Sequence, residues 1–427
     1  MKAIFYFLFI SVSLFASTLS EITHYAIIHS TVMKRSQSQT DLSELKRQES
    51  KVQQYGELNL VGDYTHYNTA RTLAPLTPNV LGSGAPIATS KDIFYTGISY
   101  AVPLFTGYAQ TRQIEISTLA KQMAHAKMKL TKEQLVYNIR SLYLSVLAQQ
   151  QILYAQRSYT TALQTLSKKI AYEVELGKKA KIDLFKAQSN ARASLTQVEV
   201  LKNNIDIIKA TLSSLVGKEV KHLSTIKIKV KRPNYSVNRL YRQVSQLAKV
   251  EIEDMSLRKA DKIIAKSESS KLPQVNFSGF VGKNYGEDLA TDEWDNETLW
   301  QAGVNVKWNL VDFGKRDLGV QQAKIAKMEA TFQKEQTLLD LRKLLTEAVA
   351  KIKQSYAEYL GNSTQLRLSQ KSEKIEDVRY KNDVSTLNDL LLAKGQTQLA
   401  RAKVIESRYN YQKSKYYLDY LLERGVE

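Results

Sequence analysis

Residues 103–113 read PLFTGYAQTRQ, and the pattern of the chain changes within this stretch. Upstream of it, residues 94–102 place their side chains on two alternating faces, with the period of two that is typical of a β-strand. Downstream, residues 108–176 contain neither glycine nor proline, and these 69 residues predict a helical rod of roughly 100 Å. The sequence therefore predicts a strand that turns at residues 103–107 into one very long helix.

The same pattern recurs in the second half of the chain. Shifted by 206 residues, the two halves align without a gap from about residue 94 to the C-terminus, so that Leu104 falls on Leu310 and Leu184 on Leu390. Upstream the shift becomes 217 residues, because the first half has about 11 extra residues in a Pro-, Gly-, Ser- and Thr-rich loop near 68–91; the counterpart loop is 284–298. Each half is therefore predicted to run strand, loop, strand, long helix, turn and helix.

These patterns predict the boundaries of the parts. The first repeat covers residues 20–220, with a leading helix, strands at 57–67 and 92–104 and a helical hairpin at 108–216. A linker at 221–237 leads into the second repeat at 238–427. That repeat has its own leading helix, strands at 273–283 and 299–310 and a helical hairpin at 314–422.

The chain begins MKAIFYFLFISVSLFAS, which is one lysine followed by a short apolar run and small residues. This pattern predicts a secretory signal peptide over residues 1–19. No later stretch approaches 18 consecutive apolar residues, so no membrane-spanning helix is expected.

The predicted strands are amphipathic. In the fourth strand, alternate positions from Trp300 to Leu310 are apolar, and Gln301, Asn305 and Lys307 lie between them. One interpretation is a half-buried soluble sheet, but four strands cannot close a barrel and would leave edges exposed. The lengths and the apolar outer face suit a membrane barrel to which several chains contribute strands. Four aromatic residues are then expected at the membrane interface: Phe94, Tyr100, Trp300 and Trp308.

The long helices carry apolar residues at alternating spacings of three and four, as in Val198, Leu201, Ile205, Ile208 and Leu212. This is heptad-type packing. Interfaces so narrow cannot make a compact globule from such long rods, so the helices need neighbours in a bundle, a filament or a tube. A fibrous coiled coil would satisfy the helices alone, but it would not carry the paired amphipathic strands.

The composition argues against several other functions. The net charge of +19 results from 61 Lys and Arg against 42 Asp and Glu, but the lysines are spread along predicted helix faces, so no nucleic-acid partner is expected. There is no cysteine, and the five histidines have no metal-ligand spacing. No Walker-type phosphate loop occurs either. We therefore expect no metal, no cofactor and no enzymatic activity.

The two strand-to-helix junctions, PLFTGY (103–108) and NLVDFG (309–314), resemble the PLFDGG junction of TolC-family outer-membrane factors. The resemblance implies a mainly α-helical fold with a membrane β part. In such a homotrimer each chain gives four strands to one 12-stranded barrel in the outer membrane of a Gram-negative bacterium, in contact with its lipid. The helices continue the barrel as a periplasmic tunnel. The barrel–tunnel junction would then lie at Pro103, Gly107, Asn309 and Gly314.

The resemblance also implies a function. The protein would be the passive exit duct of a tripartite efflux or type I secretion system, joined by a periplasmic adaptor protein to an inner-membrane transporter of the RND or ABC type. The alternative is that the chain is itself a periplasmic adaptor with coiled-coil hairpins, a scaffold and not a pore. Adaptors carry one long hairpin between small β domains, whereas two hairpins are predicted here.

The turns of the helical hairpins resemble the periplasmic end of the family's tunnel. The sequence ELGKKAKIDLFKAQ (175–188) has the family's spacing of Gly177 and Asp183, and YKNDVSTLNDLLLAKGQ (380–396) has Asp383 in place of the glycine and Asp389 at the second position. The residues expected at the adaptor-docking tips are Gly177, Lys178, Lys179, Ala180, Asp383, Val384, Ser385 and Thr386.

Three residues match the family's gate: Asp183, Asp389 and Tyr380. This implies a Tyr380–Asp183 link, and three copies of Asp389 around a narrow axis would favour cations. Ser385 stands where the family has an arginine and Leu392 where it has a second aspartate, so no full charged latch is expected. The alternative is that Asp183 and Asp389 cap the returning helices, and both roles are compatible. Gating would require rearrangement of the hairpins at 172–190 and 378–396.

Overall fold

The structure is a computed structural model that describes residues 18–84 and 87–425. Residues 1–17 of the predicted signal peptide therefore lie outside the described residues, while Thr18 and Leu19 already belong to the start of the first helix, with Thr18 as its N-cap.

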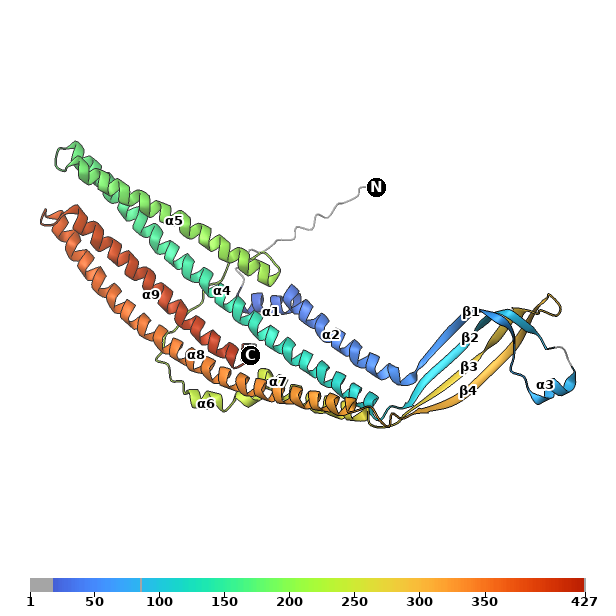
Figure 1. Cartoon of the computed structure of the whole chain (residues 1–427). Helices are drawn as coiled ribbons and strands as arrows, with labels where there is room; N and C mark the ends of the chain where they lie inside the picture. The colour runs from blue at the N-terminus through green and yellow to red at the C-terminus, as the bar shows by residue number, and fades with distance from the viewer. Residues whose placement is uncertain (1–17, 85–86, 426–427) are drawn as a thin grey trace, which may run out of the picture. The chain divides into compact units, whose positions relative to one another are not determined.

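Helices and strands follow one another in the order shown in Figure 1. The helices of the first half are α1 (Leu19–His29), α2 (Thr31–Val52), α3 (Pro78–Ser83), α4 (Ala109–Glu175) and α5 (Lys181–Val216). Those of the second half are α6 (Val237–Tyr241), α7 (Ala248–Ser269), α8 (Lys315–Lys381) and α9 (Leu387–Leu421). The strands are β1 (Glu57–Thr72), β2 (Thr89–Phe105), β3 (Gln274–Glu287) and β4 (Trp294–Lys307).

The described residues form two compact units, and α4 and α8 contribute to both. The sheet unit comprises residues 39–125 and 252–334, and the helical unit comprises residues up to 38, 126–251 and those from 335 onward. Among the described helices, none is long and apolar enough to cross a membrane.

The sheet unit contains one antiparallel sheet with the strand order β1-β2-β3-β4. Its register places Leu60 opposite Ile98, Ile98 opposite Val281 and Val281 opposite Trp300. Since side chains alternate between the faces of a strand, this row lies on one face of the sheet. The outer strands β1 and β4 each have one edge without a partner strand in the described residues.

The strands differ from the predicted ones mainly at their ends. The loop predicted at 284–298 is largely a continuation of the β3–β4 ladder, which pairs Glu287 with Trp294 and leaves a turn at 288–293. Polar residues that suit a loop by composition are here held by cross-strand hydrogen bonds. At its other end β4 stops at Lys307, so Trp308 follows the strand and is not part of it. The short helix α3 within the loop at 68–91 was not predicted.

The helical unit contains two long hairpins, α4–α5 and α8–α9. Shifting the bounds of α4 and α5 by 206 residues gives those of α8 and α9 to within one residue. Buried side chains follow the predicted spacing of three and four, as in Leu201 and Ile205 of α5 and Leu345, Ala348 and Ile352 of α8. The segment at 217–236 contains no helix and is held to the hairpins by hydroxyls: Tyr143 donates to Ser224 O at 2.6 Å, and Tyr411 donates to Lys231 O at 2.8 Å.

Candidate functional site

One face of the sheet is apolar and exposed. Its exposed large apolar side chains include Leu58, Leu60, Tyr64, Phe94, Ile98, Tyr100, Val281, Trp294, Trp300, Val304 and Val306. Leu60 is 83% exposed and Trp300 78% exposed, both within the same cross-strand row. Soluble monomers rarely expose a contiguous apolar surface of this kind, so this face requires an apolar partner.

Aromatic rings gather near both ends of the apolar face. At one end the ring of Phe94 lies 4.7 Å from that of Tyr64 and 5.6 Å from that of Trp294. At the other end the rings of Tyr100 and Phe277 lie 6.4 Å apart. Positions 94 and 100 of one strand are separated by roughly 20 Å, close to the height of the apolar band of an outer-membrane barrel. Two aromatic belts flank such bands.

The four aromatics expected at the interface are placed differently from one another. Phe94 and Tyr100 stand near the two ends of the apolar face, and Trp300 lies between them. Trp308 follows the strand, and its indole N–H donates to Lys271 O at 3.1 Å. Tyr64 and Trp294 belong to the cluster around Phe94 but were not among the predicted interface aromatics. Trp294 lies in the stretch that was predicted as a loop, whereas Tyr64 lies within the predicted strand at 57–67.

The opposite face of the sheet is largely polar. Asp63, Tyr95 and Asn284 form one of its cross-strand rows. Phe280 is a buried exception: its ring stacks on Tyr95 at 4.6 Å and covers Gly97, where an added Cβ would lie 2.5 Å from the ring. The glycine thus makes room for an aromatic ring that lies flat on the sheet.

Each strand-to-helix junction contains one glycine and one aromatic residue, in opposite order. Gly107 and Tyr108 have φ of +63° and +70°, and Phe313 and Gly314 have φ of +54° and +90°. Left-handed conformations favour glycine, and an added Cβ at Gly107 would lie 2.5 Å from Ser269 O. Both glycines were predicted at the junction. Tyr108 and Phe313 share their conformation but were not singled out.

The helices that follow the junctions begin with side-chain caps. Thr106 Oγ1 accepts from Gln110 N at 3.2 Å in the first junction, and Asp312 accepts from Arg316 N at 3.0 Å in the second. These residues stand 206 positions apart. Threonine or aspartate just before a helix is a recognised N-terminal signal, so both could have been found from the sequence.

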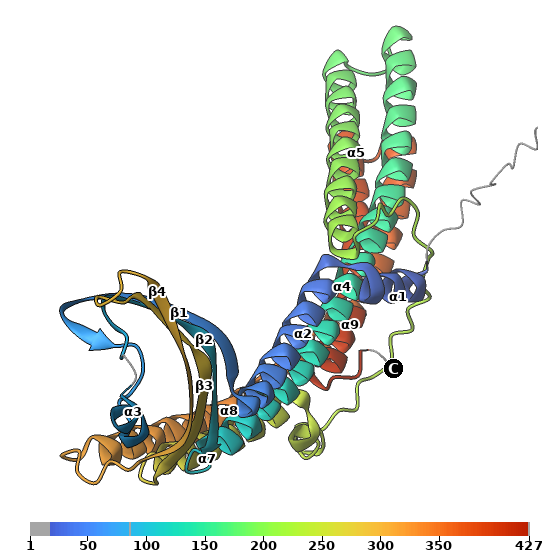
Figure 2. The same ribbon diagram turned by 90° about the vertical axis from the view of Figure 1, so that its right-hand side faces the viewer.

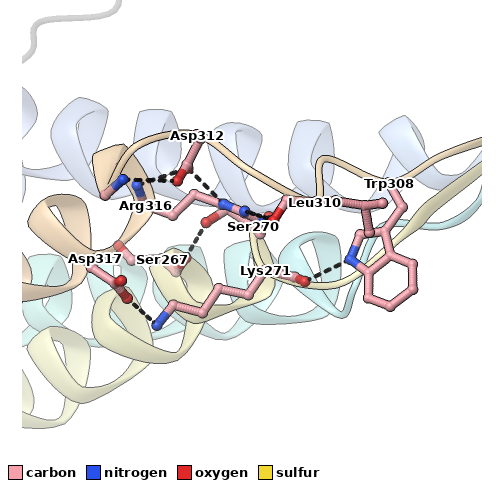
Figure 3. A network of polar contacts seen from close by, with 9 residues as sticks. Ser267, Ser270, Lys271, Trp308, Leu310, Asp312, Arg316 and Asp317 are labelled. Carbon is pink, nitrogen blue, oxygen red and sulfur yellow. Dashed lines mark hydrogen bonds and ion pairs between the residues drawn. The ribbon is translucent and has the colours of Figure 1, made fainter.

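The second junction is held by a network of polar contacts around Asp312 (Figure 3). Arg316 Nε donates to the Asp312 carboxylate at 2.6 Å, and Arg316 Nη2 reaches Leu310 O at 3.5 Å. Burial alone would raise the pKa of Asp312, but the hydrogen bonds and charge of Arg316 outweigh it and lower that pKa. Lys271 pairs with Asp317 in the same network. The carboxylate thereby ties the last residues before α8 to its first turn.

The hairpin turns of the helical unit follow the same backbone path. Gly177 and Asp383 have φ of +72° and +57°. In the first turn Lys178 N donates to Glu173 O, and in the second Val384 N donates to Arg379 O, both at 2.8 Å. This is the Schellman pattern that ends a helix. Aspartate is among the few residues other than glycine that tolerate such a conformation, which explains Asp383 at the glycine position.

An ion pair joins the two hairpin turns. Lys179 Nζ of the first turn lies 2.6 Å from Asp383 Oδ1 of the second and 5.0 Å from the centre of the Tyr380 ring. The hydrogen bond lowers the pKa of Asp383 and raises the pKa of Lys179. Both residues were predicted at the tips, but their pairing was not.

Tyr380 is a buried residue of the hairpin core. It is 7% exposed and belongs to a cluster with Leu163, Ile170, Leu387 and Leu390. Burial raises the pKa of its phenol. Within the described residues the hydroxyl has no hydrogen-bond partner, so the expected link from Tyr380 to Asp183 is not formed in this structure.

The two predicted aspartates differ in what they bind. Asp389 forms a capping box with Thr386: Asp389 N donates to Thr386 Oγ1 at 3.2 Å, and Thr386 N donates to Asp389 Oδ2 at 3.1 Å. The hydrogen bond from the Thr386 hydroxyl lowers the pKa of Asp389. The N-cap of α5 is Ala180, which has no capping oxygen, and the Asp183 carboxylate has no hydrogen bond or ion pair with the described residues.

The remaining tip residues are mostly exposed. Lys178 is exposed, Val384 is 65% exposed, and Leu392 of the returning helix is 59% exposed. The Ser385 hydroxyl is buried and has no partner among the described residues. The tips thus present a lysine and an apolar side chain to the outside, and one free carboxylate lies a turn further on. Among the described residues, no cluster of His, Cys, Asp and Glu could hold a metal ion.

Residues 246–422 match the family model of the outer membrane efflux proteins. None of the curated proteins matches the chain. Among solved structures, the CmeC outer membrane channel of Campylobacter jejuni superposes with a TM-score of 0.78 at 14% identity, over 96% of this chain and 86% of that one. The outer membrane protein VceC of Vibrio cholerae gives 0.76 at 13% identity, over 96% of this chain and 97% of that one. The open state of the Neisseria gonorrhoeae MtrE outer membrane channel gives 0.75 at 13% identity, over 96% and 89%.

These likenesses confirm the fold expected from the sequence. The chain is mainly helical, has one four-stranded antiparallel sheet, and follows the fold of outer-membrane channels of the TolC type along nearly its whole length.

Proposed function

Because residues 246–422 are an outer membrane efflux protein domain in a chain with the fold of outer-membrane channels, we propose that this protein is the exit duct of a tripartite efflux or type I secretion system. The family match supports a role in transport at the outer membrane and not an enzymatic one. One observation carries the proposal of a channel: a single sheet has an exposed apolar face with aromatic ends, opposite a polar face.

The sheet implies that several copies associate. Four strands are too few to close a barrel, and the free edges of β1 and β4 are a liability unless they pair. Pairing β4 of one copy with β1 of the next removes both edges and puts every apolar face outward. Closure by three copies gives the 12-stranded barrel that the resemblance implies.

The start of α8 supports this association. Five exposed apolar residues follow one another at spacings of seven, three, four and seven along the helix: Leu318, Ile325, Met328, Phe332 and Leu339. Such spacing defines one helix face suited to a coiled-coil partner. We expect this face to pack against a neighbouring copy.

The hairpin turns are the proposed gate and adaptor-docking end. The exposed Lys178 and Val384 would contact the adaptor, and Lys179–Asp383 would hold the two hairpins of each chain together when the gate is closed. Three copies of the unpaired Asp183, with Asp389, would give the narrow end a negative field that favours cations. Transport would be passive, and an inner-membrane pump would supply the energy.

The adaptor alternative is not favoured. An adaptor of the expected kind would have one helical hairpin between small β domains, whereas this chain has two hairpins, each preceded by two strands of a common sheet.

Membrane fractionation of the producing cells tests the proposal. We expect the protein in the outer-membrane fraction, extractable only with detergent and migrating as a heat-sensitive trimer. Recovery in the periplasmic fraction without detergent would contradict it.

A further inference from the structure

The connection between β1 and β2 folds back over the polar face of the sheet. Asn284, which lies in a row of that face, donates from Nδ2 to Leu73 O at 2.7 Å. Leu73 is only 1% exposed, and its N–H donates to Ala88 O at 3.3 Å. The chain therefore turns inward as soon as it leaves β1.

The other end of this connection is held by the turn between β3 and β4. Thr89 N donates to the carboxylate of Asp288 at 3.0 Å, and Leu289 N donates to Thr89 O at 2.9 Å. Asp288 is 5% exposed. Since both ends of the connection are hydrogen-bonded to the sheet, the fold sets the direction in which it runs.

An open pocket of about 620 Å³ lies beside this contact, between the start of the connection and the polar face. Asp63, Tyr95 and Asn284 line it from the sheet, and Leu73 and Pro75 line it from the connection. The connection thus contacts the polar face at Leu73 and leaves an open pocket beside that contact. Figure 2 shows α3 on the concave side of the curved sheet, the side to which this segment turns.

The first residues of the connection carry no charged side chain and are rich in apolar residues. Residues 73–84 read LAPLTPNVLGSG, and Leu76 and Leu81 are 50% and 63% exposed. Leu76 and Leu81 thus leave apolar surface that the described residues of their own chain do not cover. Copies of the same segment around a common axis would cover it.

We propose that residues 73–84 project into the mouth of the barrel, where Leu76 and Leu81 of the associated copies form an apolar constriction that limits the size of the solutes that leave. This rests on the proposed channel, because the polar face becomes the lumen only when the sheet closes. An apolar constriction excludes bulky and strongly hydrated solutes by sterics and by dewetting. The second half of the chain has only the short turn at 288–293 at the equivalent place, so the first half alone supplies the constriction.

The first experiment tests whether the segments converge. The chain has no cysteine, so a single Leu81→Cys substitution gives one thiol per copy. We expect a short bis-maleimide to cross-link copies of Leu81→Cys in intact cells. The matched control is Leu289→Cys, which replaces a half-exposed leucine on the other turn, and it should remain uncross-linked. Equal cross-linking of both variants, or none of Leu81→Cys in a protein that migrates as a trimer, would overturn the proposal.

The second experiment tests whether the segment restricts passage. Ser99 lies on the polar face of β2, four residues along the strand from Tyr95 of the pocket. Ser99→Cys therefore places a thiol on the face that would line the lumen. In intact cells a maleimide carrying a long polyethylene glycol chain should label this thiol at least about tenfold faster when Leu76 and Leu81 are replaced by serine or residues 75–84 are deleted. A small maleimide should label all variants at similar rates. An unchanged rate for the large reagent would overturn the constriction.

These outcomes are distinct from failure of the proposed function. If the protein did not form an outer-membrane trimer, fractionation and migration would show it before any thiol was introduced. A trimer in which Leu81→Cys does not cross-link would leave the channel standing and remove only the constriction.

Discussion

The two hairpin turns follow the same backbone path with different chemistry. The first has Gly177 as its left-handed residue, and its Ala180 N-cap gives α5 no side-chain cap. The second has Asp383 as its left-handed residue, and the Thr386–Asp389 capping box begins α9. The first turn therefore supplies a lysine and a free carboxylate, while the second is locked by its own side chains. The ion pair of Lys179 with Asp383 holds the first turn to the second. We infer that the first turn is the more easily moved of the two.

The largest expected effect concerns Tyr380, on which both turns rest. Tyr380→Ala should lower the free energy of opening of the hairpin ends by about 3 kcal/mol, because a buried ring is removed from the core. Tyr380→Phe should leave it unchanged or raise it by up to about 1 kcal/mol, because the lost hydroxyl has no partner among the described residues. Amide hydrogen exchange of hairpin peptides measures both. If Tyr380→Phe lowered the free energy of opening as much as Tyr380→Ala, the hydroxyl would have to form a stabilising hydrogen bond.

Gly177 tests the backbone of the first turn. Gly177→Ala should destabilise that turn by about 1.5 kcal/mol, because alanine is strained at a φ of +72°. Gly361 in the interior of α8 is the matched control: it is exposed, an added Cβ there meets nothing within 4 Å, and Gly361→Ala should stabilise its helix by about 1 kcal/mol. Hydrogen exchange rates that change in the same direction for both substitutions would contradict the left-handed turn.

The caps can be exchanged between the turns. Thr386→Ala should speed hydrogen exchange in the first turn of α9, because the lost cap lowers the stability of that turn by about 1 kcal/mol. Ala180→Thr should slow exchange in the first turn of α5 by a similar amount, because Asp183 stands at the position that a capping box requires. If Ala180→Thr had no effect on α5, the difference between the turns would not lie in their caps.

The ion pair between the turns should have the smallest effect on stability, because both groups are partly exposed to solvent. Its effect on gating should be clearer: Lys179→Ala and Asp383→Asn should each raise the open fraction of the channel, and reversing the pair with Lys179→Asp and Asp383→Lys should restore the closed state. Single-channel recording measures this. Equal opening in the single and the reversed variants would show that the pair does not hold the gate.

The same pair predicts a pH dependence. The pKa of Asp383 is lowered in the folded state. The stabilisation that this carboxylate gives is therefore present above the ordinary carboxyl pKa of 3.8 and is lost only as the pH falls through the lower, folded value. The raised pKa of Lys179 keeps the lysine charged through neutral pH. The link should therefore remain intact from pH 5 to pH 8 by hydrogen exchange, and a transition within that range would point to another group.

The periodic parts of the molecule could be predicted from the sequence. Strand alternation and heptad spacing repeat over many residues, so single exceptions do not hide them, and Gly107, Gly177 and Gly314 mark turns because of their conformation. Asp383 was predicted only to stand in place of the glycine, and the structure adds its left-handed conformation.

Contacts between distant segments could not be predicted in the same way. The Lys179–Asp383 pair joins residues 204 positions apart, and only the packing of the hairpins brings them together. Tyr380 at a helix end suits a gate and a core equally well from sequence alone, and burial decides between them. The caps Thr106 and Asp312 and the Thr386–Asp389 box were readable from local spacing and were overlooked or left as an alternative.

The central claim is that several copies of this chain close one conducting pore. Purified, detergent-extracted protein reconstituted into planar lipid bilayers tests it directly. We predict a heat-sensitive trimer that gives discrete conductance steps, with a preference for cations that Asp183→Asn reduces. A protein that remains monomeric in detergent and produces no conductance steps would contradict the account.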